Sequence, residues 1–532
     1  MSTRETNPWA ALGALCTGFF MVLLDTTIVS IAIPSMLRGL CADLNAVIWA
    51  VSVYLLAYAV PMLFTSRLGD RVGPKRVFLA GLVVFTGASL WCGLSGSVGM
   101  LIAARAVQGF GAALLTPQTL AFIGHLFPPA KRGSAMGVWA GVAGLGTIAG
   151  PLLGGLLVDR LGWAWVFFVN VPIGVVALVL TWRLVPDWRP KHAHSFDVPG
   201  VLLAAAGLAA VIFGVQNGQK YAWGKVVGNV SVFEIIGLGV ALLVGFVLWQ
   251  RANRKEPLLP LEVFGNRTFS AGTFAFATIG FALIGMFLPL VVYVQSVLEL
   301  TPTEAGLLLA PVALVSTAVG PFVGRVSDKV EGKYLVMAGL AALAAGLGLF
   351  AAQASPASAP WALVPALVVC GLGFGLALAP VSNATMSSVE PRLVGTASGV
   401  FNTARQVGGV LGSAAVGVLL QARIAASVTV EAATAAASVP PEYRARFVAE
   451  VTGAASSAGE FGSGGAAPPV SGLPADLAAR WTGLVTQAVR NGLADAARQS
   501  VLLPVAVLVL GILAAAAMRR NAPAHEETVP AS

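Results

Sequence analysis

The chain has 532 residues, of which 57% are hydrophobic and only 10% are charged. A soluble globular protein carries about a quarter charged residues, so this composition excludes an ordinary soluble enzyme. The formal net charge of +9 would suit a nucleic-acid partner only if the basic residues formed a patch, so their distribution along the chain decides that question.

The apolar residues fall in blocks long enough to cross a bilayer, which takes about 20 helical residues. These continuous runs exclude a β-barrel, which would show alternating segments of about ten residues. The first block is too long, and follows too few basic residues, to be a cleaved signal peptide. We predict an all-α membrane protein with fourteen spans, at residues 9–33, 47–65, 77–95, 99–122, 134–157, 165–185, 198–216, 231–249, 269–297, 305–324, 335–352, 361–381, 396–420 and 501–518.

The basic residues indicate how these spans are oriented. An even number of spans places both termini on one face of the membrane. If that face is the cytoplasm, its tails and loops hold 20 of the 32 Lys and Arg residues, whereas the short loops opposite hold four, Arg38, Arg160, Lys220 and Lys225. This bias is typical of membrane topology. We therefore expect a multi-pass protein of a bacterial inner membrane, with cytoplasmic termini and no nucleic-acid partner.

Motifs of catalysis and metal binding are missing from the sequence. The four cysteines, Cys16, Cys41, Cys92 and Cys370, are scattered without CxxC spacing, so we expect no disulfide framework and no metal site. The chain also lacks a P-loop, an H-E-x-x-H motif and a nucleophile elbow. This argues against ATP-driven transport, against a membrane-embedded enzyme and against a bound cofactor.

The spans are grouped as six, two and six. We predict a first six-helix bundle over residues 1–185, a linker with two inserted helices over 186–267, and a second six-helix bundle over 268–532. A long loop at 421–500 would separate the last two spans on the outer face. Its middle, 454–474, is rich in Ala, Ser, Gly and Pro and should be mobile, whereas 477–498 could form an amphipathic surface helix.

The turns that follow the second span of each half have similar sequences. Ser66–Lys75 and Gly324–Lys333 both place a small residue, a basic residue, Asp and another basic residue at matching positions. Such an internal repeat is expected of a transporter built from two related halves.

These features resemble the major facilitator superfamily, and within it the fourteen-helix drug:proton antiporters. The turn at 66–76 is similar to the family pattern Gly-x-Leu-Ala/Asp-Arg-x-Gly-Arg-Lys, although Ser66 and Pro74 depart from it. Glycine permits the tight turn, and an Asp there can cap a helix or pair with a cation. The resemblance implies a conformational latch, in which a basic neighbour must replace the missing Arg as partner of the Asp. Its members would be Asp70, Arg71, Gly73 and Lys75.

The fifth span resembles the antiporter signature Gly-x(8)-Gly-x(3)-Gly-Pro-x-x-Gly-Gly. Its small residues form a flat face for close helix packing, and the proline adds a kink. The resemblance implies export in preference to uptake. The residues that match are Gly137, Gly146, Gly150, Pro151, Gly154 and Gly155.

Three further segments resemble the same family. They are Leu24–Val29 with Ala32–Pro34 in the first span, Arg105 with Gln108–Gly111 in the fourth, and Trp163–Gly174, where Ala164 stands in place of the usual Arg.

Asp25 is the carboxylate with the clearest mid-span position. Burial favours the neutral acid, so Asp25 could exchange protons and report its state to neighbouring helices. The first and fourth helices adjoin in the fold that the sequence resembles, so Arg105 could modulate Asp25. We predict that these two residues couple transport to protons.

Other polar residues within spans could line a substrate cavity. Asn402, Arg405 and Gln406 share part of one helix face, and Gln118 lies in the fourth span; helix packing is the alternative role for these residues. The rest of the wall should be apolar. With one central acid, this cavity would suit neutral or monocationic lipophiles.

We therefore predict proton-coupled efflux of lipophilic drugs or secondary metabolites by alternating access, in a monomer powered by the proton gradient. The alternative is a facilitator or symporter of the same superfamily that imports a small organic nutrient. The direction of transport distinguishes the two.

Overall fold

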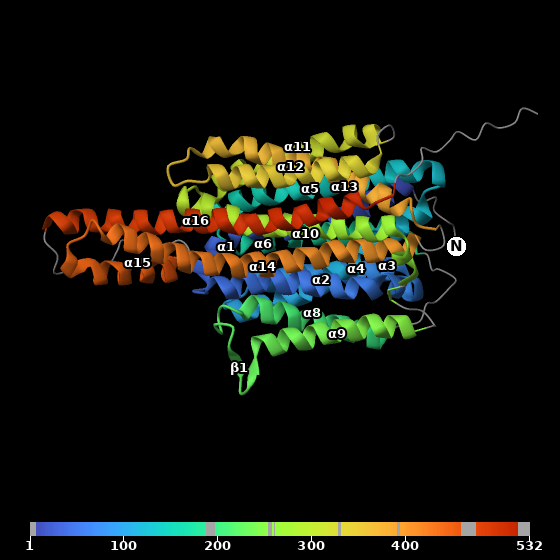
Figure 1. Ribbon diagram of the computed structural model, residues 1–532. Coiled ribbons are helices and arrows are strands. Elements are labelled where there is room, and N and C mark those ends of the chain that lie inside the picture. Colours follow the sequence, from blue (N-terminus) through green and yellow to red (C-terminus); the bar gives the residue numbers. More distant parts are fainter. Residues whose placement is uncertain are drawn as a thin grey trace, which may run out of the picture.

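A computed structural model describes residues 7–187, 197–253, 258–259, 261–327, 331–390, 394–458 and 475–519 of the chain. Most of these residues lie in long helices that run side by side in one bundle (Figure 1). Thirteen of the described helices are long and apolar enough to cross a membrane, and α5 (Pro129–Leu161) covers the remaining predicted span. The predicted all-α membrane architecture is therefore confirmed. We call the end where α1 begins the N-side end, and the opposite end the far end.

The first half of the bundle contains the first six spans. Asn7, Asp43 and Ser97 each accept a backbone hydrogen bond as the N-cap of a helix, as their residue types favour. Gly73 lies between two helices with a φ of 107°, a conformation that favours glycine. The helices are α1 (Pro8–Gly39), α2 (Leu44–Val72), α3 (Pro74–Gly93), α4 (Val98–Leu126), α5, α6 (Trp165–Phe168) and α7 (Asn170–Leu184).

The inserted pair consists of α8 (Val198–Asn217) and α9 (Val232–Ala252), joined by a short antiparallel hairpin of β1 (Lys225–Val227) and β2 (Val230–Ser231). The pair lies along one side of the bundle (Figure 1), where α8 contacts both α2 and α14. At the N-side end of the pair, the Asp197 carboxylate accepts hydrogen bonds from Trp249 and Gln250 of α9.

The second half repeats the arrangement of the first. A short 3-10 helix, η1 (Leu261–Gly265), precedes it. Its elements are α10 (Arg267–Val292), the π-helical η2 (Tyr293–Val297), α11 (Pro302–Ser327), α12 (Gly332–Gln353), the 3-10 helix η3 (Pro360–Leu363), α13 (Val364–Met386), α14 (Val394–Ala436), the 3-10 helix η5 (Pro441–Tyr443), α15 (Arg444–Ala458) and α16 (Ala475–Ala516).

Two matched lysines support the internal repeat. Lys75 donates from Nζ to backbone oxygens at the end of α7, with 2.5 Å to the oxygen of Val185. Lys333, at the matching position of the second half, donates to the end of α16, with 2.8 Å to the oxygen of Ala516. Cations are favourable at helix C-termini. Each half therefore ties the start of its third span to the end of its last span in the same way.

The predicted loop at 421–500 is wrong over most of its length. α14 continues to Ala436, α15 follows, and α16 begins at Ala475 and runs without a break into the last span. The segment 421–436 carries no apolar block, but it is rich in alanine, the best helix former. Residues 459–474, which hold most of the segment expected to be mobile, lie outside the described residues.

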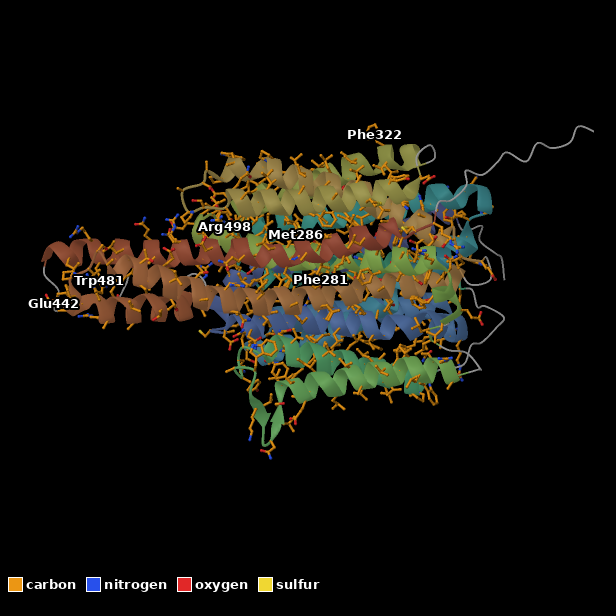
Figure 2. The ribbon with its side chains drawn as sticks, in the orientation of Figure 1. Phe281, Met286, Phe322, Glu442, Trp481 and Arg498 are labelled. Carbon is orange, nitrogen blue, oxygen red and sulfur yellow. The ribbon has the colours of Figure 1, made fainter. Side chains whose placement is uncertain are left out.

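These parts of α14, α15 and α16 form a far extension that projects beyond the rest of the bundle (Figure 1). Its core contains Leu477, Trp481 and Val485, which recur every four residues and are buried, so the predicted amphipathic face at 477–498 is confirmed. The ring of Trp481 meets that of Phe447 edge to face at 5.2 Å, and its Nε1 donates to Glu450 at 3.0 Å. Figure 2 shows Trp481 within this extension.

We expect Trp481→Ala to destabilise the far extension. It removes a fully buried ring and leaves Glu450 without its donor, which should cost about 3–5 kcal/mol. Limited proteolysis and thermal unfolding in detergent measure the effect. The control is Trp361→Ala, because Trp361 is 77% exposed and its loss should change stability by less than about 0.5 kcal/mol. Equal sensitivity of the two variants would contradict the described packing.

Candidate functional site

A buried ion pair lies within the first half of the bundle. Arg105 of α4 donates from Nη1 to Oδ2 of Asp25 of α1 at 2.6 Å, and the two side chains are 1% and 0% exposed. A lone charge at membrane depth costs about 3 kcal/mol on insertion scales and requires a partner. The structure brings together the two residues that the sequence singled out for proton coupling.

Two amides and a hydroxyl complete what we call the Asp25 network, formed by Asp25, Ser89, Arg105, Gln108 and Asn170. Oδ1 of Asp25 accepts from Nε2 of Gln108 at 2.8 Å and from Nδ2 of Asn170 at 3.0 Å. Both amides also donate to Oγ of Ser89, and Nη1 of Arg105 donates to Oε1 of Gln108. The network thus joins α1, α3, α4 and α7.

Arg105 is held by α2 as well. Its Nε donates to the backbone oxygen of Ala50 at 3.2 Å, and its Cζ lies 3.8 Å from the ring centroid of Tyr54. The hydroxyl of Tyr54 lies 3.4 Å from that of Thr26, next to Asp25 on α1. Charge, hydrogen bonds and an aromatic face therefore fix the guanidinium from three sides.

The geometry around Asp25 suits a carboxylate. Three N–H donors point at its two oxygens, and an ionised carboxylate can accept from all of them. The sequence suggested a proton-binding acid modulated by Arg105, and the structure places Arg105 in direct contact with this buried acid.

Several members of the network were not predicted as site residues. Gln108 and Asn170 lie in segments with a family resemblance, yet neither received a role. The available signal was an uncharged amide inside an apolar block, which needs a partner when it is buried. Ser89 gave no such signal, since a lone serine in a helix usually bonds to its own backbone.

The glycines of α5 hold it against α1 on both sides of Asp25. A Cβ at Gly146, Gly150 or Gly154 would overlap α1, and the one at Gly150 would meet Thr27. The hydroxyl of Thr27 lies 3.4 Å from the backbone oxygen of Gly146. The predicted packing face is therefore present, and it faces the helix that carries Asp25.

The neighbouring residues of the same motif face the other half. A Cβ at Gly155 would overlap the backbone of Pro302 in α11, and one at Gly306 would overlap the backbone of Pro151. The motif thus packs α5 between α1 and α11. Gly137 lies outside the residues whose packing is described.

The predicted latch is only partly described. The side chain of Asp70 lies outside the description, and Arg71 is exposed. Gly73 forms the expected tight turn. Lys75 was expected to serve as a possible partner of Asp70, but its described bonds go to the end of α7. Unsatisfied carbonyl groups at a helix C-terminus attract a cation, so this lysine stabilises α7.

The residues predicted for the cavity wall differ in their surroundings. Gln118 donates to the backbone oxygen of Thr65 at 2.8 Å and is fully buried, so its amide packs α4 against α2 instead of lining a cavity. Asn402 donates to its own helix at Ser398. Gln406 is 6% exposed, and the neighbouring Arg405 is half-buried.

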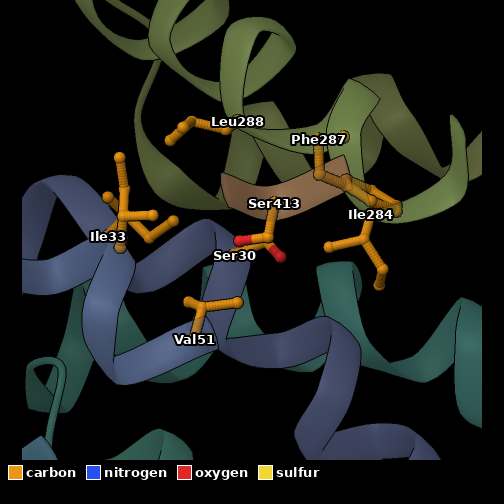
Figure 3. Close-up of a pocket in the computed structure, with 9 residues that line it drawn as sticks. Ser30, Ile33, Val51, Ile284, Phe287, Leu288 and Ser413 are labelled. Carbon is orange, nitrogen blue, oxygen red and sulfur yellow. The ribbon is translucent and has the colours of Figure 1, made fainter. Parts of the chain in front are cut away.

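A small cavity lies between the two halves (Figure 3). Its volume is about 20 Å³, which holds about one water molecule. A pocket for a drug-sized molecule takes about 300–1,000 Å³, so the halves are closed at this level. The lining residues are Ser30, Ile33, Ile48 and Val51 from the first half, and Ile284, Gly285, Phe287, Leu288 and Ser413 from the second.

Hydrogen bonds join the halves nearer the far end. Nε2 of Gln295 donates to the backbone oxygen of Ile31 at 3.1 Å. The backbone N–H of Thr303 donates to the carboxylate of Asp159 at 2.8 Å. We call these two contacts the far-end seal.

Residues 15–413 match the family described as the Major Facilitator Superfamily. The chain belongs to this superfamily. An uncharacterized transporter of this type from Mycobacterium tuberculosis is 44% identical over 80% of this chain and 72% of its own length. A tetracenomycin C resistance and export protein of Streptomyces glaucescens is 34% identical, over 79% and 77%. A puromycin resistance protein of Streptomyces alboniger is 35% identical, over 77% and 81%.

Solved structures show the same fold. A bacterial homologue of the human lysosomal transporter Spinster, in an inward-facing and unoccupied conformation, aligns with a TM-score of 0.62. The alignment covers 98% of this chain and all of that one, at 16% identity. The predicted major facilitator fold, with two six-helix halves and an inserted pair, agrees with this likeness.

We expect the Asp25–Arg105 pair to show strong energetic coupling. Asp25→Asn or Arg105→Gln alone leaves one buried charge without its partner, which should cost about 3–5 kcal/mol. The double variant removes both charges and should lose much less than the sum of the two. Thermal unfolding of the four proteins in one detergent measures the coupling. Additive losses would show that the pair does not form.

We expect Gly150→Leu to separate α5 from α1 or to prevent folding, because the added side chain overlaps Thr27. Overpacking of this kind costs at least about 1–3 kcal/mol. Gel filtration and thermal unfolding measure the loss. The control is Gly141→Leu on the same helix, where an added Cβ has no neighbour within 4 Å. A tolerated Gly150→Leu would contradict the described α1–α5 contact.

Proposed function

We propose that this protein is a proton-coupled exporter of lipophilic small molecules, including antibiotics or secondary metabolites. The observation that carries the proposal is the buried Asp25 network on a helix packed against the glycine motif of α5. Relatives that are named for resistance to, or export of, tetracenomycin C and puromycin support the direction of transport.

In this proposal the N-side end of the bundle faces the cytoplasm of a bacterial cell. The excess of basic residues on the predicted cytoplasmic side supports that orientation. The far extension then lies outside the cell membrane. The protein acts as a monomer, it is not an enzyme, and the proton gradient supplies the energy without a bound cofactor.

Asp25 is the proton-binding group of the proposed cycle. A proton on its carboxyl group adds an O–H donor and removes the negative charge, so the charge-assisted bonds from Arg105, Gln108 and Asn170 become weaker. Because these donors lie on α4 and α7, protonation changes how α1 is held within the first half. The transmembrane potential contributes about 2.3 kcal/mol per charge for each 100 mV.

The shift of α1 is transmitted to the far-end seal in two ways. α1 itself carries Ile31, the partner of Gln295 in the other half. The glycine face of α5 follows α1, and α5 ends near Asp159, the partner of Thr303. Proton binding at Asp25 thereby changes the strength of the far-end seal, and the latch at 66–76 stabilises one of the two conformations.

Transport in proteoliposomes tests the proposal. The vesicles contain a pH-sensitive dye, carry a proton gradient and receive a panel of lipophilic compounds. Wild-type protein should move protons only when a substrate is present. The Asp25→Asn/Arg105→Gln variant removes both charges of the pair and leaves neither one unpaired, so it should fold and yet lose substrate-linked proton movement.

The control is Glu442→Gln, which changes an exposed carboxylate in the far extension and should leave transport unchanged. Proton movement that survives in the double variant would remove Asp25 from the coupling step. A wild-type protein that takes up a nutrient without a gradient, and moves no lipophile against protons, would favour the facilitator of the same superfamily.

A further inference from the structure

Arg405 is a second arginine inside a span, and the predicted spans hold no free carboxylate that could pair with it. Within the fourteen apolar blocks the only carboxylates are Asp25 and Glu234. Asp25 is paired with Arg105, and Glu234 caps the first turn of α9 at Ser231. The predicted spans therefore contain no carboxylate that is left to neutralise Arg405.

The position of Arg405 along α14 places it deep in the membrane. It follows the start of the helix at Val394 by eleven residues, a rise of about 16 Å. The hydrocarbon core of a bilayer is about 30 Å thick. Arg405 thus lies well within the span, away from both ends of the predicted block 396–420.

The surroundings of Arg405 are aromatic. Its Cζ lies 5.8 Å from the ring centroid of Phe276 in α10, and that ring stacks on Phe401, one turn before Arg405, with a centroid distance of 4.0 Å. In the part of the chain that the structure describes, the guanidinium has no carboxylate partner and no hydrogen-bond acceptor.

Close packing fixes the backbone that carries Arg405. A Cβ at Gly280 would overlap the backbone oxygen of Arg405, and one at Gly408 would overlap the backbone of Ala277. α10 and α14 therefore meet without intervening side chains at this level. The guanidinium remains half-buried, between helices of the two halves.

We propose that Arg405 binds the negative charge of the transported molecule, and that the substrates are lipophilic monoanions such as aromatic carboxylates, phenolates or sulfonates. A guanidinium at this depth requires an anion or a wet cavity, and its planar donors match a carboxylate or a sulfonate. The buried, stacked rings of Phe276 and Phe401 make the surroundings of the charge apolar. This assignment rests on the proposed function and specifies its substrate.

This substrate class differs from the one suggested by the sequence. A single central acid favoured neutral or monocationic compounds, but Arg105 already neutralises that acid. The charge left for a ligand is positive. Recognition by Arg405 therefore selects against cations of the same size.

Tyr54 and Tyr58 connect this site to the Asp25 network. The two tyrosines lie one turn apart on α2, with ring centroids 6.1 Å apart. Tyr54 contacts Arg105, and α2, which carries both tyrosines, contacts α14, which carries Arg405. The hydroxyl of Tyr58 is fixed by Thr116 of α4 at 2.7 Å. A bound anion and the proton site thus share one rigid helix face.

The test uses three probes with the same ring system, namely 1-naphthoate, 1-naphthalenemethanol and 1-naphthylmethylammonium. Isothermal titration of the full chain in lipid nanodiscs, with empty nanodiscs subtracted, gives the affinity for each probe. Wild-type protein should bind the anion at least tenfold more tightly than the alcohol, and should bind the cation most weakly. Arg405→Gln should weaken naphthoate at least tenfold and change the alcohol less than twofold, whereas Arg405→Lys should keep most of the preference for the anion.

The control is Lys225→Gln, which removes a basic residue in the β1–β2 hairpin and should leave all three affinities unchanged. Gel filtration and unchanged binding of the alcohol show that Arg405→Gln is folded. Equal affinity of wild type for the three probes, or a preference for the cation, would overturn the proposal. So would an equal loss of naphthoate and of the alcohol in Arg405→Gln.

A parallel transport assay separates this inference from the proposed function. Proton-linked export of cations or neutral lipophiles, without an effect of Arg405→Gln, would preserve the exporter and overturn the anion site. Naphthoate binding that depends on Arg405, without proton-linked movement of any probe, would preserve the anion site and overturn proton-coupled export.

Discussion

The cost of placing a charge in an apolar membrane interior governs the organisation of this protein. Two arginines and one aspartate are buried deep in the bundle, and the aspartate neutralises only one arginine. Two amides, a hydroxyl and the ring of Tyr54 surround the Asp25–Arg105 pair. Their contacts join α1, α2, α3, α4 and α7. The same interaction that holds the first half together is therefore the proposed site of proton binding.

Glycine contacts place the buried charges in both halves. In the first half, Gly150 and its neighbours press α5 onto the helix that carries Asp25. In the second half, Gly280 and Gly412 bring α10 and α14 into backbone contact near Arg405. The first and fifth spans of each half are thus packed by the same means. Small residues allow helices to approach closely in lipid, where the hydrophobic effect does not drive association.

The sequence predicted the spans well because continuous apolar runs are a strong signal. It also predicted the matched turns, of which Lys75 and Lys333 proved to be structural equivalents. It failed at 421–500, where an alanine-rich polar segment has no apolar block and yet forms long helices. The partners of Asp25 required three-dimensional contacts between residues up to 145 positions apart. The isolation of Arg405 could be recognised only after Arg105 was seen to occupy the one central carboxylate.

The helix α14 is unusually long. Its 43 residues span about 64 Å at 1.5 Å per residue, whereas a bilayer with its headgroups is about 40–45 Å thick. The helix is therefore about 20 Å longer than a bilayer is thick, and α15 and α16 pack against it. A tilt of the second half by a few degrees, too small to resolve easily among packed helices, is magnified at the tip. The tip of the far extension would thus move farther than the helices within the bundle whenever the second half tilts.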